Sequence, residues 1–325
     1  MKIDDQNKKP PLYIFLHIPK TGGTTFGRHL IGGLKKGEAI GIYSWPGTLV
    51  SIKSLEELDK LINSWPAAAK DRLRVIHGHN IYLGIEKLFP DREIRYLTFF
   101  REPLSRAASH YNFYRQKFEA GARAKYYTDI VEGQKGVLSF EEAFLKNKIL
   151  HNYTFKFLAD FIFNTDSAED PQADYSNEQA NQKILAKIKA VLKKFYFIGL
   201  TENSEDDFLY FYYWLGVKKF FANQRRSKKF FDLSKISPEF KNLWQSANWL
   251  DGELYKWAIK SNEDFKKSHP EFQRVVLLMK IKRFFYLPQR YLTSLRVLLY
   301  KISAILKKKS NVYAKLINKF KFILV

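Results

Sequence analysis

The sequence contains no cysteine and only two methionines among its 325 residues. The absence of cysteine excludes a disulfide framework, a thiolate zinc site and a cysteine nucleophile, and it suits a reducing compartment. The chain also lacks any run of 18 uncharged apolar residues, so we expect no membrane-spanning helix. Its first eleven residues are polar and lack the apolar segment of a secretory signal. From these absences we expect a cytoplasmic protein.

Acidic residues are missing from the C-terminal segment. Residues 274–325 carry 13 Lys and Arg and no Asp or Glu, whereas the whole chain has 55 basic and 33 acidic residues. The resulting net charge of +22 favours anionic partners. With 46% hydrophobic and 27% charged residues, the composition is that of a globular protein. We predict a main domain over residues 1–271 and a basic amphipathic helical tail over 272–325.

In this tail, apolar residues recur at spacings of three and four with Lys and Arg between them, and Pro288 divides the segment. The pattern is typical of a helix that lies on an anionic membrane surface, so one hypothesis is peripheral attachment to the inner face of the cell membrane. The alternative is a helical subdomain that packs on the core and exposes a solvated basic face. Nucleic acid is not expected as a partner, because no known module with aromatic stacking platforms is recognisable.

Short apolar runs rich in β-formers alternate with helical patterns along the chain. Strands are predicted at 12–18, 74–79, 94–100 and 195–200. Helices are predicted from a cap at Thr25 to about residue 32, and at 103–117, 139–147, 151–163, 178–194 and 205–215. This alternation predicts an α/β fold with a central parallel sheet flanked by helices, and with ligand sites beyond the carboxyl ends of the strands.

A glycine- and threonine-rich loop, PKTGGTT at residues 19–25, joins the first predicted strand to the first helix. Glycines let the backbone approach an oxyanion closely, and the following helix start offers N–H groups and a positive dipole end. The loop is not a Walker A motif, in which the Lys stands at the helix start rather than near the beginning of the loop. We predict an anion-binding loop here, with a plain glycine-rich turn as the alternative.

Two further polar motifs follow predicted strands. Arg101 stands directly after the third strand and Ser109 follows about two helical turns later, so both side chains could hold one phosphate; a salt bridge at the helix start is the alternative. His77 and His79 end the second strand, where an imidazole can serve as a general base. A structural histidine is the alternative there, and no second cluster of ligand residues supports a metal site.

The order of these motifs over residues 12–225, namely HIPKTGGTT, HGH, FFREPLSRAASHY and FIGLTENSEDD, resembles the sulfotransferases that use 3′-phosphoadenosine 5′-phosphosulfate (PAPS). The likeness is to the carbohydrate branch that includes heparan sulfate 2-O-sulfotransferase. It implies a P-loop-like sulfotransferase fold, PAPS as co-substrate without a metal, and transfer of a sulfuryl group to a carbohydrate hydroxyl. Golgi members carry a membrane anchor and cysteines that are absent here, so we expect a cytoplasmic relative whose acceptor is a polysaccharide, a lipid-linked glycan or a small glycoside.

The resemblance also implies roles for individual residues. The Lys20 ammonium would stabilise charge on the leaving phosphate, His79 would be the general base and His77 a supporting group. Arg101 and Ser109 would hold the 3′-phosphate. Packing is expected of Thr201 and Glu202, and residues 223–227 loosely match a basic loop that closes over the nucleotide. The residues implied in binding the 5′-phosphosulfate are Lys20, Thr21, Gly22, Gly23, Thr24 and Thr25.

Two other functions remain open at this stage. One is a non-catalytic, basic nucleotide- or membrane-binding module. The other is a nucleotide or sugar kinase-like enzyme, which is disfavoured by the missing Gly-Lys-Ser/Thr motif and by the lack of a clear magnesium-binding partner. The remaining histidines are expected to be structural: His17, His29, His110, His151 and His269.

Overall fold

The computed structural model describes residues 9–42, 55–122, 128, 130–133, 136–147, 150–163, 177–217 and 230–285. The strands are β1 (Leu12–Leu16), β2 (Ala39–Ile42), β3 (Val75–Gly78), β4 (Ile94–Phe100), β5 (Glu132–Gly133), β6 (Gly136–Val137) and β7 (Phe197–Leu200). The α-helices are α1 (Gly23–Gly33), α2 (Leu55–Asn63), α3 (Ala67–Arg72), α4 (Pro103–Glu119), α6 (Phe140–Lys146), α7 (Tyr153–Phe163), α8 (Glu178–Leu192), α9 (Ser204–Trp214), α10 (Pro238–Ala247) and α11 (Trp249–Ser268). Short 3-10 helices occupy Ile85–Leu88, Thr201–Asn203 and Leu233–Lys235.

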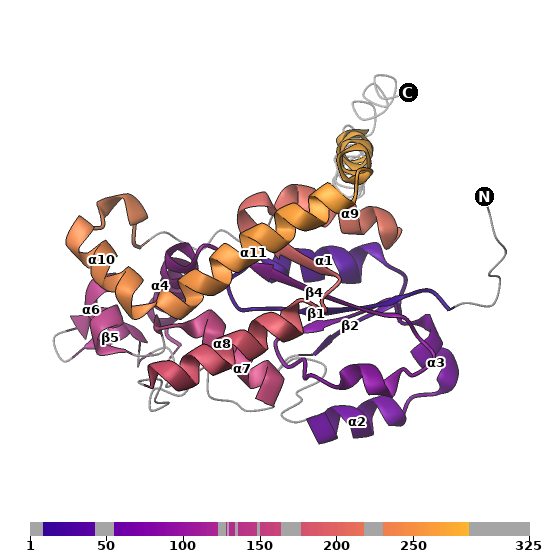
Figure 1. Cartoon of the computed structure of the whole chain (residues 1–325), viewed down its shortest axis with the longest axis horizontal. Helices are drawn as coiled ribbons and strands as arrows, with labels where there is room; N and C mark the ends of the chain where they lie inside the picture. Colours follow the sequence, from indigo (N-terminus) through magenta and orange to yellow (C-terminus); the bar gives the residue numbers. More distant parts are fainter. Residues whose placement is uncertain are drawn as a thin grey trace, which may run out of the picture.

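Five parallel strands form the central sheet in the order β2-β3-β1-β4-β7 (Figure 1). The four strands expected from the sequence are confirmed to within three residues at each end, and so is the α/β class. The edge strand β2 was not predicted. The antiparallel pair β5–β6 forms a separate two-stranded sheet. Because the five strands are parallel, all their carboxyl ends meet at one edge of the sheet.

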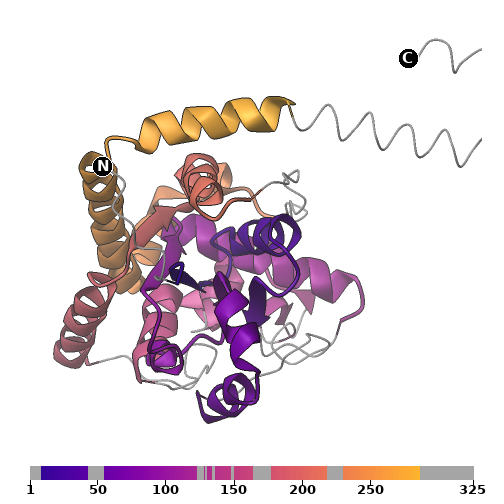
Figure 2. The same cartoon turned by 90° about the vertical axis from the view of Figure 1, so that its right-hand side faces the viewer.

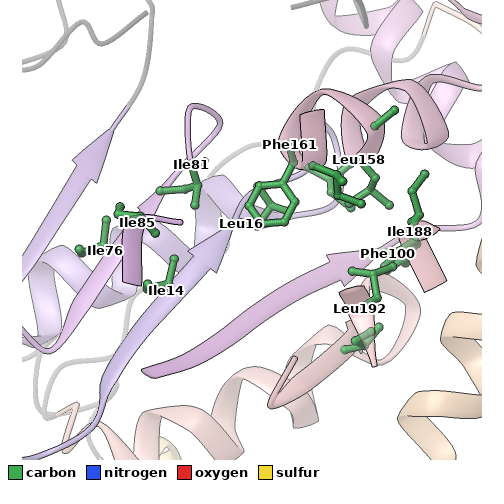
Figure 3. Close-up of a cluster of buried hydrophobic side chains, with 14 of the residues drawn as sticks. Ile14, Leu16, Ile76, Ile81, Ile85, Phe100, Leu158, Phe161, Ile188 and Leu192 are labelled. Carbon is green, nitrogen blue, oxygen red and sulfur yellow. The ribbon is translucent and has the colours of Figure 1, made fainter. Parts of the chain in front are cut away.

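Both faces of this sheet are covered, as parallel sheets require. On one face, Tyr13 and Phe15 of β1 pack with Phe26 of α1 and with the aromatic residues of α9. On the other face, Ile14 and Leu16 belong to a cluster with apolar side chains from α7, α8 and α11 (Figure 3). The alternation of side chains along β1 therefore divides the core into two layers.

The outer strand β7 is covered by α11, the long helix that crosses the molecule in Figure 1. The buried Asn262 of α11 donates a hydrogen bond from its side-chain amide to the Ile198 carbonyl of β7, at 2.9 Å. An edge strand normally leaves such a carbonyl to water or to another chain. The sheet therefore presents a covered edge on this side.

The predicted tail begins as a helix that spans residues 272–285 in the structure. Its residues Phe272, Val275, Val276 and Met279 are buried in the same cluster as α9 and the sheet. Within the described part of the chain, no helix is long and apolar enough to cross a membrane. The tail beyond residue 285 and the loosely matched loop at 223–227 lie outside the described residues, and the domain boundary at 271 stays a prediction.

Candidate functional site

The candidate site lies where the strand order changes direction, between β1 and β4. From β1 the sheet extends through β3 and β2 on one side and through β4 and β7 on the other. In open α/β sheets, ligands bind in the crevice beyond the carboxyl ends of strands at such a point. The residues that follow β1, β3, β4 and β7 include Lys20, His79, Arg101 and Thr201, so the topology brings the predicted motifs to one edge.

The loop after β1 has an unusual backbone. Lys20 has a φ of 70° and Gly22 a φ of 85°, both in the left-handed region. Gly22 is the N-cap of α1 and the helix begins at Gly23, so the expected cap at Thr25 is wrong: Thr25 lies inside the first turn. No side chain caps the start of α1, and its first turn contains no acidic residue. The positive end of this helix is thus left to a ligand or to solvent.

Buried hydrogen bonds fix the loop to its neighbours. The hydroxyl of Thr21, which is fully buried, donates to the Ile18 carbonyl at 2.8 Å. The Thr201 hydroxyl lies 2.8 Å from the Thr21 carbonyl and 3.0 Å from the Phe100 carbonyl, so it shares its proton between the loop after β1 and the end of β4. Besides the packing role expected from the sequence, Thr201 thus holds the loop through polar contacts.

Arg101 is joined to the same loop. Its guanidinium donates to the Lys20 carbonyl at 3.2 Å, and burial is the main reason that its pKa lies below the ordinary value. The carboxylates of Glu202 and Glu102 offset part of this effect by stabilising the charged guanidinium. The Glu102 carboxylate also caps α4 by accepting from the backbone N–H groups of residues 104 and 105. Glu202 in turn accepts from the Glu102 backbone N–H at 2.9 Å. Arg101 therefore lies between the loop after β1, which it contacts directly, and the segment after β7, which Glu202 joins to Glu102.

The Lys20 ammonium lies 4.2 Å from the centre of the Phe113 ring on α4, a cation–π contact. Ser109 is half-buried and stands one turn before Phe113, so these two residues share a face of the helix. The contact places the middle of α4, one turn beyond Ser109, beside the loop that carries Lys20. Phe113 is a site residue that the sequence did not reveal, because an aromatic residue on a helix is usually part of the core.

His79 is held by His17, from the end of β1. The His79 Nδ1 atom lies 2.6 Å from the His17 carbonyl oxygen, and the two rings stack with centroids 4.2 Å apart. Burial, with a smaller effect of the Lys20 ammonium, lowers the pKa of His79 to about 4. A neutral imidazole next to a carbonyl must carry its proton on Nδ1, so Nε2 holds the lone pair that can accept a proton.

His77 occupies a different environment. It is 2% exposed and lies under α1, where a Cβ atom at Gly27 would come within 2.9 Å of its ring. Burial, followed by the proximity of His79, lowers the pKa of His77 to about 4. His17 packs against Gly23 in the same way, since a Cβ there would come within 2.0 Å of the His17 ring. From the sequence we expected His17 to be structural. Its role in orienting His79 through the backbone carbonyl was not predicted.

The predicted residues thus fall into one connected group. Lys20, Arg101 and Thr201 are linked by hydrogen bonds through the loop, and His79 is linked to that loop by His17 and Gly23. Thr24 is exposed on the first turn of α1. Among the residues that the structure describes, no group of three His, Asp or Glu side chains could hold a metal ion. The arrangement offers cations and a helix start for an anion, beside a neutral histidine.

Comparison with known proteins gives a consistent result. Residues 8–247 match the profile of the sulfotransferase family. Heparan-sulfate 6-O-sulfotransferase 2 of Homo sapiens and of Mus musculus are each 24% identical over 289 residues, which cover 79% of this chain and 45% of each relative. The Gallus gallus protein of the same name is 24% identical over 295 residues, covering 79% of this chain and 68% of its own length. The chain therefore spans less than half of the human and mouse relatives, and these relatives belong to the 6-O branch rather than the 2-O branch expected from the sequence.

Proposed function

The chain belongs to the sulfotransferase family, and on that basis we propose that it transfers the sulfuryl group of PAPS to a hydroxyl of a carbohydrate acceptor, with His79 as the general base. The observation that carries this proposal is the junction between the loop after β1 and the strand end of β4, where Lys20 and Arg101 meet beside a neutral His79. An anion-binding loop and a proton acceptor at one sheet edge are the two requirements of the reaction.

The residues present fit a donor with anionic groups. The start of α1 has no side-chain cap and no acidic residue in its first turn, so its dipole and N–H groups suit a phosphosulfate. Gly22 and Gly23 keep side chains away from that approach, and the left-handed φ of Gly22 favours glycine there. Arg101 and Ser109 would hold the 3′-phosphate, in the way that a guanidinium and a hydroxyl recognise phosphate oxygens.

PAPS would supply a sulfuryl group that is already activated, so the protein needs mainly to position reactants and stabilise charge. His79 would accept the acceptor's hydroxyl proton at Nε2 while that oxygen forms its bond to sulfur and the bond from sulfur to the phosphate oxygen breaks. Lys20 would stabilise the negative charge left on the departing phosphate. The His17 carbonyl would stabilise the imidazolium of His79, because the Nδ1–H group donates to it throughout. His77 would support His79 from beneath α1.

The acceptor is proposed from charge and from the relatives. Residues 1–273 contain 42 Lys and Arg against 33 Asp and Glu, and this basic excess favours an acidic glycan over a neutral one. The relatives are named as heparan-sulfate 6-O-sulfotransferases, so the 6-hydroxyl of a heparan-sulfate-like polysaccharide is the first position to test. A lipid-linked glycan and a small glycoside are further acceptors for the same assay.

Calorimetric titration with 3′-phosphoadenosine 5′-phosphate, against AMP and ATP, tests the donor class. We expect micromolar affinity for the bisphosphate and at least tenfold weaker binding of the other two, since only the bisphosphate has a group for Arg101. The Arg101→Ala variant should bind it about tenfold to hundredfold more weakly, which corresponds to one charged hydrogen-bonded contact. Equal affinity for the three nucleotides would remove the proposal and favour a kinase-like enzyme or a binding module.

Transfer of radiolabelled sulfate from PAPS to a polysaccharide tests the chemistry. Lys20→Ala should lower turnover about 10²- to 10³-fold, and His79→Ala by about 10²-fold or more. Lys35→Ala, two residues beyond the C-terminal end of α1, is the matched control for the loop lysine. Added imidazole should restore part of the activity of His79→Ala, a rescue that a merely structural histidine would not show. Normal turnover in the His79→Ala variant would assign the base to another group.

A further inference from the structure

The helix at 272–285 has a buried apolar face. Phe272, Val275, Val276 and Met279 are each at most 4% exposed and pack with the aromatic residues of α9. With about 100° between successive residues of an α-helix, these four positions fall in one sector about 100° wide. Packing against the core therefore explains the apolar residues on one face of this helix. It does not explain apolar residues on any other face.

A second apolar face lies opposite the first. Its residues fall within about 70° of the direction that points away from the buried sector. Their exposed fractions range from 40% to 70%. Single exposed apolar residues are ordinary on protein surfaces, but five on one helix face form a patch of the kind that marks an interaction surface. These residues, here called the outer face, are Leu277, Leu278, Ile281, Phe284 and Phe285.

The orientation of the outer face is fixed by ion pairs on the inner side. The Lys280 ammonium lies 2.6 Å from an Asp206 carboxylate oxygen at the start of α9, and Arg283 pairs with Glu205 in the adjoining position. Together with the buried face, these pairs prevent the helix from rolling to hide its outer residues. Figure 2 shows this helix crossing the top of the body, with one side turned away from it.

Basic charge surrounds and continues the outer face. The exposed Arg274 lies on the face itself. Lys280 and Lys282 stand at its two borders, the first paired with Asp206 and the second with its ammonium 5.6 Å from the centre of the Tyr213 ring. The sequence then adds nine Lys and Arg and no Asp or Glu over residues 286–325. A second copy of the chain would bring like charge against like charge. A nucleic acid would match the charge but would leave the apolar residues in water. A surface with both anionic groups and an apolar layer matches both features.

We propose that the outer face of helix 272–285 docks on an anionic lipid surface. Phe284, Phe285 and Ile281 enter the boundary between headgroups and acyl chains, while the exposed Arg274 on the same face contacts the lipid phosphates. Each basic residue near such a surface adds attraction that falls with ionic strength. The proposal does not depend on catalysis, because none of these residues belongs to the candidate site.

Cosedimentation of the full chain with vesicles tests this surface. One set of vesicles contains phosphatidylglycerol and phosphatidylcholine, and the other contains phosphatidylcholine alone. We expect partition onto the first set only, and an at least tenfold lower partition coefficient for a variant with Ile281→Gln, Phe284→Gln and Phe285→Gln. These positions are exposed, so the changes leave the core intact, and glutamine keeps helix propensity.

A matched triple variant controls for the loss of exposed apolar residues in general. Leu145→Gln, Leu233→Gln and Leu243→Gln alter side chains that are 65%, 37% and 48% exposed, the first and last on α6 and α10 at the opposite end of the molecule (Figure 1). This variant should partition like the wild type, and both variants should keep wild-type bisphosphate affinity. Undiminished vesicle binding of the outer-face variant, equal binding to both vesicle sets, or no binding of the wild type would each overturn the proposal. So would lipid-free self-association that the outer-face variant abolishes.

Discussion

The helices α1 and α9 both begin at the carboxyl edge of the sheet, but their first turns are filled in opposite ways. The first turn of α9 holds three acidic residues, and the first turn of α1 holds none. Each acid of α9 has a basic partner from the C-terminal helices: Glu205 with Arg283, Asp206 with Lys280 and Asp207 with Lys266. The carboxylates of the first turn thereby offset the positive end of the α9 dipole, and the basic residues in turn balance the carboxylates.

At α1 the corresponding charge is left uncompensated by any side chain of its own first turn. Gly22 caps the helix without a side-chain bond, and the loop that precedes the helix carries a cation, Lys20. Two helix ends with the same dipole therefore differ in what they can accept. The start of α1 is therefore proposed as an anion site on two grounds: its first turn lacks acidic residues, and the preceding loop contains a cation.

The largest effect is expected from placing an acidic residue in the first turn of α1, as in the first turn of α9. Thr24→Glu places a carboxylate on the exposed first turn of α1. We expect about a hundredfold loss of bisphosphate affinity from repulsion beside the anion site, although the same carboxylate stabilises the helix by about 0.3–1 kcal/mol. Calorimetry and urea denaturation of the variant measure the two effects.

Thr24→Gln is the control for this substitution, because it changes size and polarity without adding charge. It should keep affinity within a few-fold of the wild type. If Thr24→Glu bound the bisphosphate normally, the start of α1 would not be the anion site.

Lowering the pH should destabilise the packing beneath α1 by protonating a buried histidine. The α1 side packs on neutral histidines, and burial lowers the pKa of His77 to about 4 from its ordinary 6.5. The stabilisation from a neutral His77 is therefore complete above pH 6.5 and is lost as the pH falls toward 4. Between pH 7.5 and 5.5 we expect this residue to reduce the free energy of unfolding by about 1 kcal/mol.

Urea denaturation at the two pH values measures that loss, and His77→Gln isolates it. In the variant the difference in unfolding free energy between the two pH values should shrink by the same amount. A difference as large as in the wild type would show that other groups, such as His17 and His110, carry the whole pH dependence.

A third helix start, that of α4, gives the smallest effect. Its cap is the Glu102 carboxylate, which accepts from two backbone N–H groups at 3.0 and 2.7 Å. Glu102→Ala should lower the free energy of unfolding by about 1 kcal/mol, as the loss of a helix cap does. Thermal denaturation tests this, with Glu119→Ala at the other end of α4 as the control. A loss no greater than in that control would mean that α4 does not depend on its cap.

Much of the fold was predictable because four of the five parallel strands are apolar runs with strong β propensity. The missed strand β2 is only four residues long and contains Gly41, so its strand character comes from pairing with β3 rather than from its own residues. The helix α11 was also missed, and it is held by contacts distant in sequence, such as Asn262 with Ile198. Local patterns do not contain such contacts.

The candidate site likewise contains residues that the sequence predicted and residues that it did not. Lys20, Arg101 and His79 stand beside predicted strand ends, so their convergence follows from the parallel topology. The parts that orient them do not follow from it: the ring of Phe113 against Lys20, the carbonyl of His17 against His79 and the hydroxyl of Thr201 against Thr21. Each of these contacts joins segments 62 or more residues apart in the chain, and only the folded structure brings them within reach.

The contact between Gly23 and the His17 ring has a consequence for how this protein can change. An alanine at position 23 requires a smaller residue at position 17, because its Cβ would lie 2.0 Å from the imidazole. A smaller residue at position 17 removes the ring that stacks on His79. Gly23 and the proposed base His79 are therefore coupled through His17, which contacts both. A change in the loop at position 23 would thus require changes at positions 17 and 79 as well. Substitutions at positions 17, 23 and 79 should be strongly non-additive, and a library that varies them one at a time would miss the combinations that function.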